Sequence, residues 1–216
     1  MKLLYAGYRS WAFDAYRWFI FDRPKVDKHI VSTQQDLINE LTTSHYDVVF
    51  LAGWSNLIPA EICDKHYIVA YHPSDLPNYA GGSPIQHQIM DGVIDTKATL
   101  FRVTSALDAG NVLMKNDISL DGNMSDIFVE LSKSTLQMLI KLTDEWPNIQ
   151  ETKQTNVRAR KRLKPDDSKL NIEKMTSMSA KQLYDFIRCH EDPYPNVFVE
   201  DETGKLLFKL VDFEAK

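Results

Sequence analysis

Short apolar runs alternate with amphipathic segments through the first third of the chain, and this alternation constrains the fold more than any other feature. Residues 3–7, 29–33, 47–51 and 68–71 are apolar runs of strand length, and residues 11–22 and 34–43 carry apolar side chains at helical spacing. Strands that alternate with helices through short links form right-handed βαβ units and a parallel sheet. We therefore predict an α/β fold: a Rossmann-like, mainly parallel sheet with helices on both faces.

The first predicted helix has an apolar stripe. Trp11, Ala15, Trp18 and Phe19 recur at i, i+4, i+7 and i+8, so they are expected to face the sheet, and Ser10 is the expected N-cap. Core packing is the favoured interpretation for Trp18 and Phe19. Trp11 lies beside the strand-to-helix turn and stays a candidate for ligand contact. The turn itself, residues 7–10, has no glycine-rich loop that could offer successive N–H groups to a phosphate.

The second half of the chain continues the pattern and then changes. Residues 98–104 and 111–118 are predicted strands, and residues 125–146 a long helix capped by Ser125. Polar residues 151–167 follow. Beyond them we predict a helix capped by Ser179 and a hairpin formed by residues 197–199 and 206–211. The division is thus a main domain over residues 1–150, then a linker and C-terminal extension (helix and hairpin) over residues 151–216.

The most informative segment runs from residue 68 to residue 110. His72 directly follows an apolar run, at the carboxyl end of a predicted strand, where open α/β sheets hold their ligands. A loop rich in Pro, Gly, Asn and Ser comes next, and the following strand ends just before Leu107-Asp108-Ala109-Gly110. If both strands lie in one sheet, His72 and Asp108 face each other across a cleft. Taken alone, a histidine in such a place is more often structural than catalytic.

This segment resembles the folate-dependent formyltransferases. Their pattern is Asn-x-His-x-Ser-x-Leu-Pro, a Gly-rich turn and Leu-Asp-x-Gly. It is closest to that of the nucleotide-sugar N-formyltransferases and of the catalytic domain of methionyl-tRNA formyltransferase. The position of the family's asparagine is occupied by Ala70, a departure from the pattern. The matching residues are His72, Ser74, Leu76, Pro77, Gly81, Gly82, Leu107, Asp108 and Gly110.

The resemblance implies an activity and a set of site residues. Residues 1–150 would be a formyltransferase catalytic domain that uses N10-formyltetrahydrofolate as co-substrate, with no metal or covalent nucleophile required. His72 and Asp108 would be catalytic, because formyl transfer to an amine needs a donor at the developing oxyanion and a route for a proton. The implied folate-binding residues are Trp54, Ser55, Asn56, Leu57, Ile58, Thr104, Ser105 and Leu107. The implied substrate-binding residues are Trp11, Asn78, Tyr79, Gly82 and Arg160.

Ala70 leaves three interpretations open, because loss of one oxyanion donor costs about 100- to 1000-fold in turnover. Another residue could supply the donor, the substrate could present its amine differently, or the fold could be retained without efficient transfer. The nearest candidate donors by loop position are Asn56, Asn78, Gln86 and His87.

Charge and cysteine content limit the classes of partner. The formal net charge of −5 argues against a general nucleic-acid surface, which is normally basic. The basic run at residues 158–164 reads as a solvated linker or, alternatively, as an anion site for a phosphorylated substrate. Cys63 and Cys189 stand apart and are expected to be buried thiols. With no signal or membrane-spanning stretch in the sequence, we expect a cytoplasmic protein without a membrane partner, and a homodimer is compatible with the pattern.

The acceptor is inferred by exclusion. About fifty residues remain after Pro165, fewer than a full RNA-binding domain needs, and the turn at residues 7–10 lacks the phosphate loop of the purine-pathway relative. The expected substrate is therefore a nucleotide-linked amino sugar, with no nucleic acid as partner. Two alternatives stay open: a folate-binding relative with reduced or lost transferase activity, and a hydrolase of the formyl donor.

Overall fold

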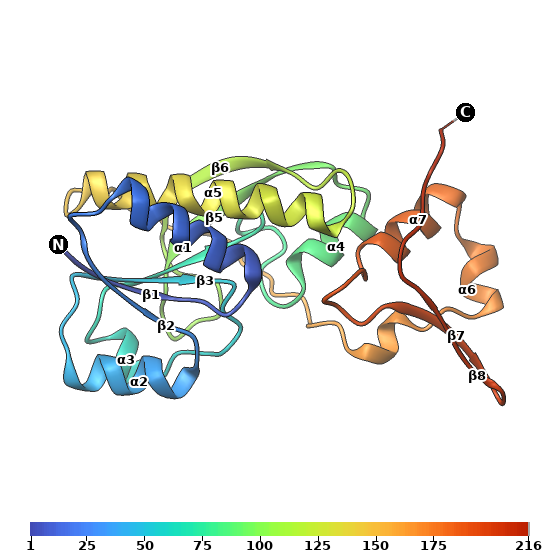
Figure 1. Cartoon of the computed structure of the whole chain (residues 1–216), viewed down its shortest axis with the longest axis horizontal. Helices are drawn as coiled ribbons and strands as arrows, with labels where there is room; N and C mark the ends of the chain where they lie inside the picture. The colour runs from blue at the N-terminus through green and yellow to red at the C-terminus, as the bar shows by residue number, and fades with distance from the viewer. Residues whose placement is uncertain (216) are drawn as a thin grey trace.

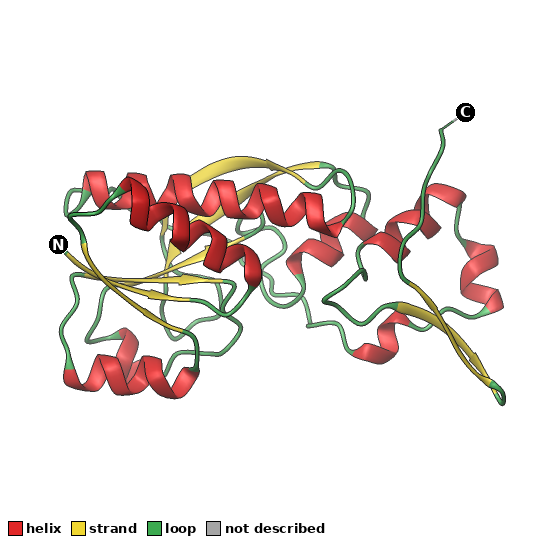
Figure 2. Cartoon of the chain, in the orientation of Figure 1, coloured by secondary structure: helices red, strands yellow, loops and turns green. Residues whose placement is uncertain are grey.

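A computed structural model describes residues 1–215 and contains one six-stranded sheet and one two-stranded sheet (Figure 2). The order of the large sheet is β2-β1-β3-β4-β5-β6, in which the first four strands are parallel and β5 and β6 are antiparallel to their neighbours. The predicted mainly parallel sheet is confirmed, with an antiparallel edge. The strands are β1 (Lys2–Ala6), β2 (Asp27–Val31), β3 (Val48–Ala52), β4 (Ile68–His72), β5 (Asp95–Arg102) and β6 (Val112–Ser119).

Helices cover both faces of this sheet, as predicted (Figure 1). Along β1, Leu3 and Tyr5 belong to the core beneath α1 (Ser10–Asp22) and α5 (Met124–Glu145). Leu4 and Ala6 belong to the core on the other side, beneath α2 (Gln34–Thr43) and α3 (Ala60–Cys63). The split follows from the alternation of side chains along a strand. The central strand β3 is buried throughout, which its apolar sequence Val-Val-Phe-Leu-Ala permits.

Three details at the helices differ from the sequence prediction. Arg9, not Ser10, precedes the first turn of α1, and no side chain caps it. Asn123 caps α5 in place of Ser125, since its side chain accepts from the N–H groups of Ser125 and Asp126. Trp18 is 64% exposed because the buried face of α1 is rotated toward Ala12 and Tyr16. The predicted cap Ser179 is confirmed on α7 (Ala180–Arg188).

The segment after α5 is tied to the main sheet by backbone pairing. Thr152 pairs with Val112 at the edge strand β6, and Arg160 pairs with Gly81 in the loop after β4. Beyond this segment, a separate apolar cluster holds the C-terminal extension, which lies at one end of the molecule in Figure 1. The extension contains the 3-10 turn η1 (Pro165–Ser168), α6 (Ile172–Ser177), α7, and the hairpin of β7 (Val197–Asp201) and β8 (Gly204–Phe208).

Buried polar contacts fix the extension on the main domain. The Arg188 guanidinium donates to the carbonyl oxygens of Leu120 at 2.7 Å and Gly122 at 2.8 Å, and it pairs with buried Asp185. Glu191 accepts from the N–H of Met124 at the start of α5, at 2.8 Å.

The cysteines and the absence of a membrane-spanning stretch were also considered in the sequence. Cys63 and Cys189 are free and buried, as expected. Within residues 1–215, no helix combines the length and the apolar character that crossing a bilayer requires.

Candidate active site

His72 is the last residue of β4, and its side chain is 9% exposed. Its Nε2 lies 2.9 Å from the carbonyl oxygen of Tyr79, and its Nδ1 lies 3.7 Å from a carboxylate oxygen of Asp108. The ring of Phe101 packs against it edge-on. One ring nitrogen is therefore hydrogen-bonded to a carbonyl, and the other lies within ion-pair distance of a carboxylate when the ring is protonated.

Asp108 reaches His72 by a route that a purely parallel sheet would not provide. Since β5 is antiparallel to β4, it ends at the opposite edge, where the N–H of Val103 donates to the carbonyl of Ile68 at 2.8 Å. Residues 103–110 then fold back, and Asp108 adopts a left-handed backbone with φ 49°. Asp108 therefore follows the carboxyl end of its strand, but that end lies at the edge of the sheet opposite to His72. Its meeting with His72 depends on the loop.

The glycine-rich loop after β4 holds the carboxylate. The N–H of Gly81 donates to Asp108 Oδ2 at 2.7 Å, and the Gln154 side chain donates to the Asp108 carbonyl at 3.0 Å. Gly81 has φ 93°, and a Cβ there would run into the backbone of Arg160. Glycine at this position is required both by the backbone angle and by the close approach.

The segments predicted to bind folate border a common apolar floor. Trp54 and Ile58 belong to the same cluster as Val103 and Ala70, which brings residues 54–58 and the start of residues 103–110 together. The indole Nε1 of Trp54 is buried and has no hydrogen-bond partner within residues 1–215. Ser55 is partly buried and hydrogen-bonded to the Tyr8 hydroxyl, whereas the other predicted side chains are exposed: Asn56, Leu57, Thr104, Ser105 and Leu107.

The predicted substrate-binding residues are placed less uniformly. Trp11 is only 4% exposed and packs on Tyr71 in the core, so its side chain offers almost no surface to a ligand. Asn78 is exposed in the loop after β4, and the N–H of Gly82 donates to the Arg160 carbonyl at 3.0 Å. The structure therefore does not gather all of these side chains around His72.

Arg160 is neutralised inside a small polar cluster. Its guanidinium donates to Asp91 at 2.8 Å and stacks over the Tyr79 ring at 4.4 Å. The Tyr79 hydroxyl also donates to Asp91, at 3.1 Å. Burial and this carboxylate raise the pKa of Tyr79. Arg160 is consequently less suited to a substrate anion than an unpaired arginine.

The surroundings of Ala70 are apolar. Ala70 pairs across the sheet with Leu51 and Phe101 and packs beside Val103. Among the candidate donors, His87 Nε2 lies 2.9 Å from the carbonyl of Lys161, and Gln86 is buried beside Tyr194. The other two candidates, Asn56 and Asn78, are exposed.

Several residues near the site were not identified from the sequence. Gln154 reaches back to Asp108 from a polar stretch without a motif, and Arg9 lies in the turn after β1. Tyr194 approaches from the C-terminal extension and stands between two prolines, a Pro-Tyr-Pro signal that could have drawn attention to it.

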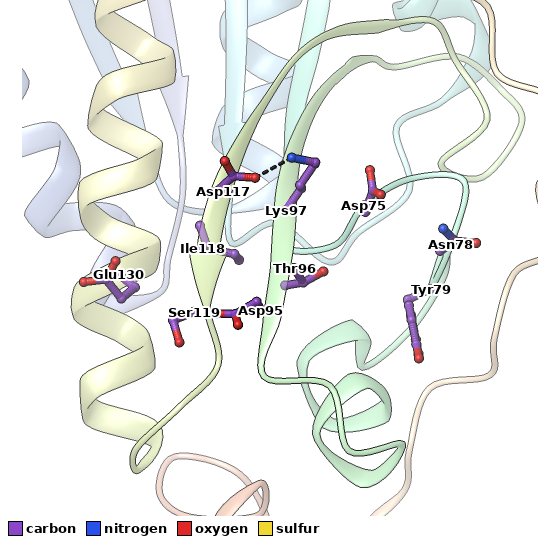
Figure 3. A pocket seen from close by; sticks show the side chains of 10 residues that line it. All are labelled: Asp75, Asn78, Tyr79, Asp95, Thr96, Lys97, Asp117, Ile118, Ser119 and Glu130. Carbon is purple, nitrogen blue, oxygen red and sulfur yellow. Dashed lines mark hydrogen bonds and ion pairs between the residues drawn. The ribbon is translucent and has the colours of Figure 1, made fainter.

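A hollow beside the loop after β4 is lined by four acidic side chains, three of which are paired with lysines (Figure 3). Its only cationic lining residue, Lys97, is paired with Asp117. The lining comes from the loop, from β5 and β6 and from α5: Asp75, Asn78, Tyr79, Asp95, Thr96, Lys97, Asp117, Ile118, Ser119 and Glu130.

Two methionyl-tRNA formyltransferases are similar to this chain, one by sequence comparison and one by comparison of structures. The methionyl-tRNA formyltransferase of Campylobacter lari is 26% identical over 183 residues, which is 83% of this chain and 58% of that protein. The chain therefore spans little more than half the length of this relative. The structure of methionyl-tRNA formyltransferase from Clostridium thermocellum superposes with a TM-score of 0.90 at 26% identity, covering 99% of this chain and 94% of that one.

A sugar N-formyltransferase from a Shewanella species has the same fold, with a TM-score of 0.79 at 14% identity over 100% of this chain and 99% of that one. The family described as Formyl transferase matches residues 18–140, which include β4, the glycine-rich loop, His72 and Asp108. The chain belongs to the formyl transferase family.

Proposed function

We propose that the protein is an N-formyltransferase that moves a formyl group from N10-formyltetrahydrofolate to the amine of a nucleotide-linked amino sugar. The observation that carries this proposal is the pair of buried His72 and partly buried Asp108, 3.7 Å apart within the family's fold.

The chain's own groups suit the handling of one proton. An amine that is acylated must lose a proton, and His72 would take it at Nδ1, the ring nitrogen that is not hydrogen-bonded to Tyr79. Its two nitrogens would then donate to the Tyr79 carbonyl and to Asp108. Asp108 is held for this task by the N–H of Gly81. The reacting groups thus meet a histidine whose orientation is set from both sides.

The folate site is proposed on the floor formed by Trp54, Ala70 and Val103. An apolar floor with few polar groups suits a flat heteroaromatic ring. The unpartnered Nε1 of Trp54 is a buried donor that a ligand acceptor would satisfy. When bound, N10-formyltetrahydrofolate supplies the formyl group.

A small acceptor is favoured over RNA by the charge around the site. The hollow lies against the loop that carries Asn78 and Tyr79, and the lysine within it is already paired (Figure 3). It lacks the excess of basic side chains with which proteins usually bind an RNA backbone. The net charge of −5 acts in the same direction.

Ala70 favours a second candidate function. With Leu51, Phe101 and Val103 around it, this position offers no side-chain donor to an oxyanion. A folate-binding protein with reduced or lost transferase activity is therefore the alternative. Hydrolysis of the formyl donor would use the same His72 and Asp108, with water as acceptor.

The test is incubation of the full chain with N10-formyltetrahydrofolate and a panel of nucleotide-linked amino sugars, with methionyl-tRNA in a parallel reaction. Release of tetrahydrofolate is followed by absorbance, and formylated product by mass spectrometry. We expect release that depends on a sugar nucleotide and disappears in His72→Asn.

Each other result selects another function. Release that depends on methionyl-tRNA alone would replace the sugar with tRNA. Release without any acceptor would indicate the hydrolase. Folate binding without release under all conditions would favour the alternative that Ala70 suggests.

A further inference from the structure

Two arginines without carboxylate partners lie close to the same tyrosine. Within residues 1–215, neither Arg9 nor Arg162 forms an ion pair. The Arg9 guanidinium carbon lies 5.7 Å from the centre of the Tyr194 ring and 5.4 Å from that of Tyr8. Burial raises the pKa of the Tyr194 phenol, and the charges of Arg9 and Arg162 oppose that rise.

Both arginines border the candidate active site. A Cβ on Gly53, at the carboxyl end of β3, would come within 2.7 Å of the Arg9 side chain. A Cβ on Gly82 would come within 2.5 Å of the Arg162 Cα. Gly82 directly follows Gly81, whose N–H holds Asp108. The Arg9 side chain and the backbone of Arg162 therefore border the site from two chain segments more than 150 residues apart in sequence.

Tyr194 is fixed between them by the C-terminal extension. It directly follows the turn in which Glu191 accepts from the N–H of Met124, so the main domain and the extension hold it jointly. The buried Gln86 side chain opposes the rise in the pKa of Tyr194. A phenol held in this way beside two guanidinium groups has the hydrogen-bond donors that a phosphate requires.

The neighbouring arginine in the same segment is different. Arg160 is paired with Asp91, whereas Arg9 is partly buried and its guanidinium lies near the rings of Tyr8 and Tyr194. A partly buried guanidinium without a counter-ion loses hydration that an anionic ligand would replace. Two planar, forked donors match a phosphate or diphosphate better than a single carboxylate.

We propose that Arg9, Arg162 and Tyr194 form a binding subsite for the diphosphate of the acceptor substrate. The proposal rests on the proposed function, in which the acceptor is linked to a nucleotide. The diphosphate would lie at the seam between the main domain and the extension, with the amine directed toward His72. The basic segment after residue 157 then acts through Arg162, not through Arg160.

The test is titration calorimetry on the full chain with uridine diphosphate and inorganic pyrophosphate as probes, and with tetrahydrofolate in separate titrations. The variants are Arg9→Met and Arg162→Met. The matched control is Arg158→Met, which removes the same charge from an exposed arginine of the same segment.

We expect each test variant to weaken diphosphate binding by about 10- to 100-fold, the scale of a charged hydrogen bond. Folate affinity should change less than about threefold, and the control should bind diphosphate like the wild type.

An absence of diphosphate binding in the wild type would overturn the subsite, as would equal weakening in all three variants, which would indicate a diffuse charge effect. A short RNA that binds through Arg9 and Arg162 while both diphosphates do not would overturn the assignment to a small molecule.

The subsite and the proposed function can be separated, because binding requires no turnover. Diphosphate binding that depends on both arginines without any formyl transfer would support the subsite and overturn the proposed function. Sugar-dependent transfer with unchanged diphosphate binding in both variants would support the proposed function and overturn the subsite.

Discussion

At the scale of single residues, His72 and Asp108 depend on neighbours that carry no chemistry of their own. The Tyr79 carbonyl and the Gly81 N–H hold one partner each, and the loop of residues 73–83 supplies both. The candidate site is therefore sensitive to the backbone of this loop as well as to its two titratable side chains.

Replacing His72 should abolish most turnover without unfolding the protein. A positioned general base contributes about 100- to 10,000-fold, so His72→Asn should reduce the rate of formyl transfer by that factor. Steady-state rates with the active acceptor measure the loss, and thermal unfolding checks integrity. His29→Asn on the edge strand β2 is the control and should stay within a few-fold of wild type. A His72→Asn protein that is folded and fully active would exclude His72 from the reaction.

The glycine-rich loop permits a comparison of two glycines with positive φ. Gly81→Ala should lower the melting temperature more than Gly92→Ala. Both positions are left-handed, at 93° and 78°, but only a Cβ at Gly81 meets backbone atoms, whereas nothing lies within 4 Å at Gly92. The strain at Gly92 is expected to cost about 1 kcal/mol. Gly81→Ala should also lower turnover, since it displaces the N–H that holds Asp108. Equal melting temperatures of the two variants would show that the Arg160 backbone moves away from the new Cβ at no cost in stability.

At the scale of elements, α5 shows how a helix start is selected. Both Asn123 and Ser125 are good capping residues, but Asn123 precedes the helix and pairs reciprocally with Asp126. The cap matters for the whole fold, because α5 covers the sheet together with α1 and receives Glu191 of the extension at its first turn.

Removing this cap should therefore destabilise the protein. Asn123→Ala is expected to cost about 1 kcal/mol in the free energy of unfolding, whereas Ser125→Ala should stay within about 0.5 kcal/mol. Urea unfolding followed by circular dichroism measures both. A larger effect for Ser125→Ala would show that Ser125, as predicted from the sequence, caps α5.

At the scale of the whole molecule, the C-terminal extension is held by buried polar groups as well as by its own apolar cluster. Arg188 spans the junction to Leu120 and Gly122, and His190 lies beside it, 3% exposed. The Nδ1 of His190 lies 2.8 Å from the Phe186 carbonyl, and its Nε2 is buried without a partner within the described residues. The division of the chain near residue 150 stays a prediction.

Burial lowers the pKa of His190 below its ordinary value near 6.5. Below that value the unfolded chain binds a proton that the folded chain resists. The stability due to this group is therefore complete above about pH 6.5 and falls as the pH falls. Urea titrations at about pH 7.5 and pH 5.5 should reveal a smaller loss in His190→Asn than in the wild type. An identical loss in both proteins would mean that His190 is protonated without penalty.

The sequence by itself determined the alternation of strands and helices, the two-sided cover of the sheet and the residues of the central motif. These are properties of local period and composition: apolar runs of strand length, apolar side chains at helical spacing, and glycines where the backbone needs them. The resemblance to the formyltransferases rested on the same local stretch, and the fold bears it out.

The tertiary structure decided what depends on contacts distant in sequence. Only the antiparallel return of β5 makes residues 103–110 fold back to His72, and strand direction cannot be read from an apolar run. Trp18 is exposed although its helical spacing predicted core packing, and Trp11 is too deeply buried to contact a ligand, because the sheet beneath a helix fixes the rotation of that helix. Arg160 was one of three arginines in one basic run, and the position of Asp91, a residue of another segment, neutralised it. Arg9 and Tyr194 lie near each other for the same reason, since only the folded chain brings them together.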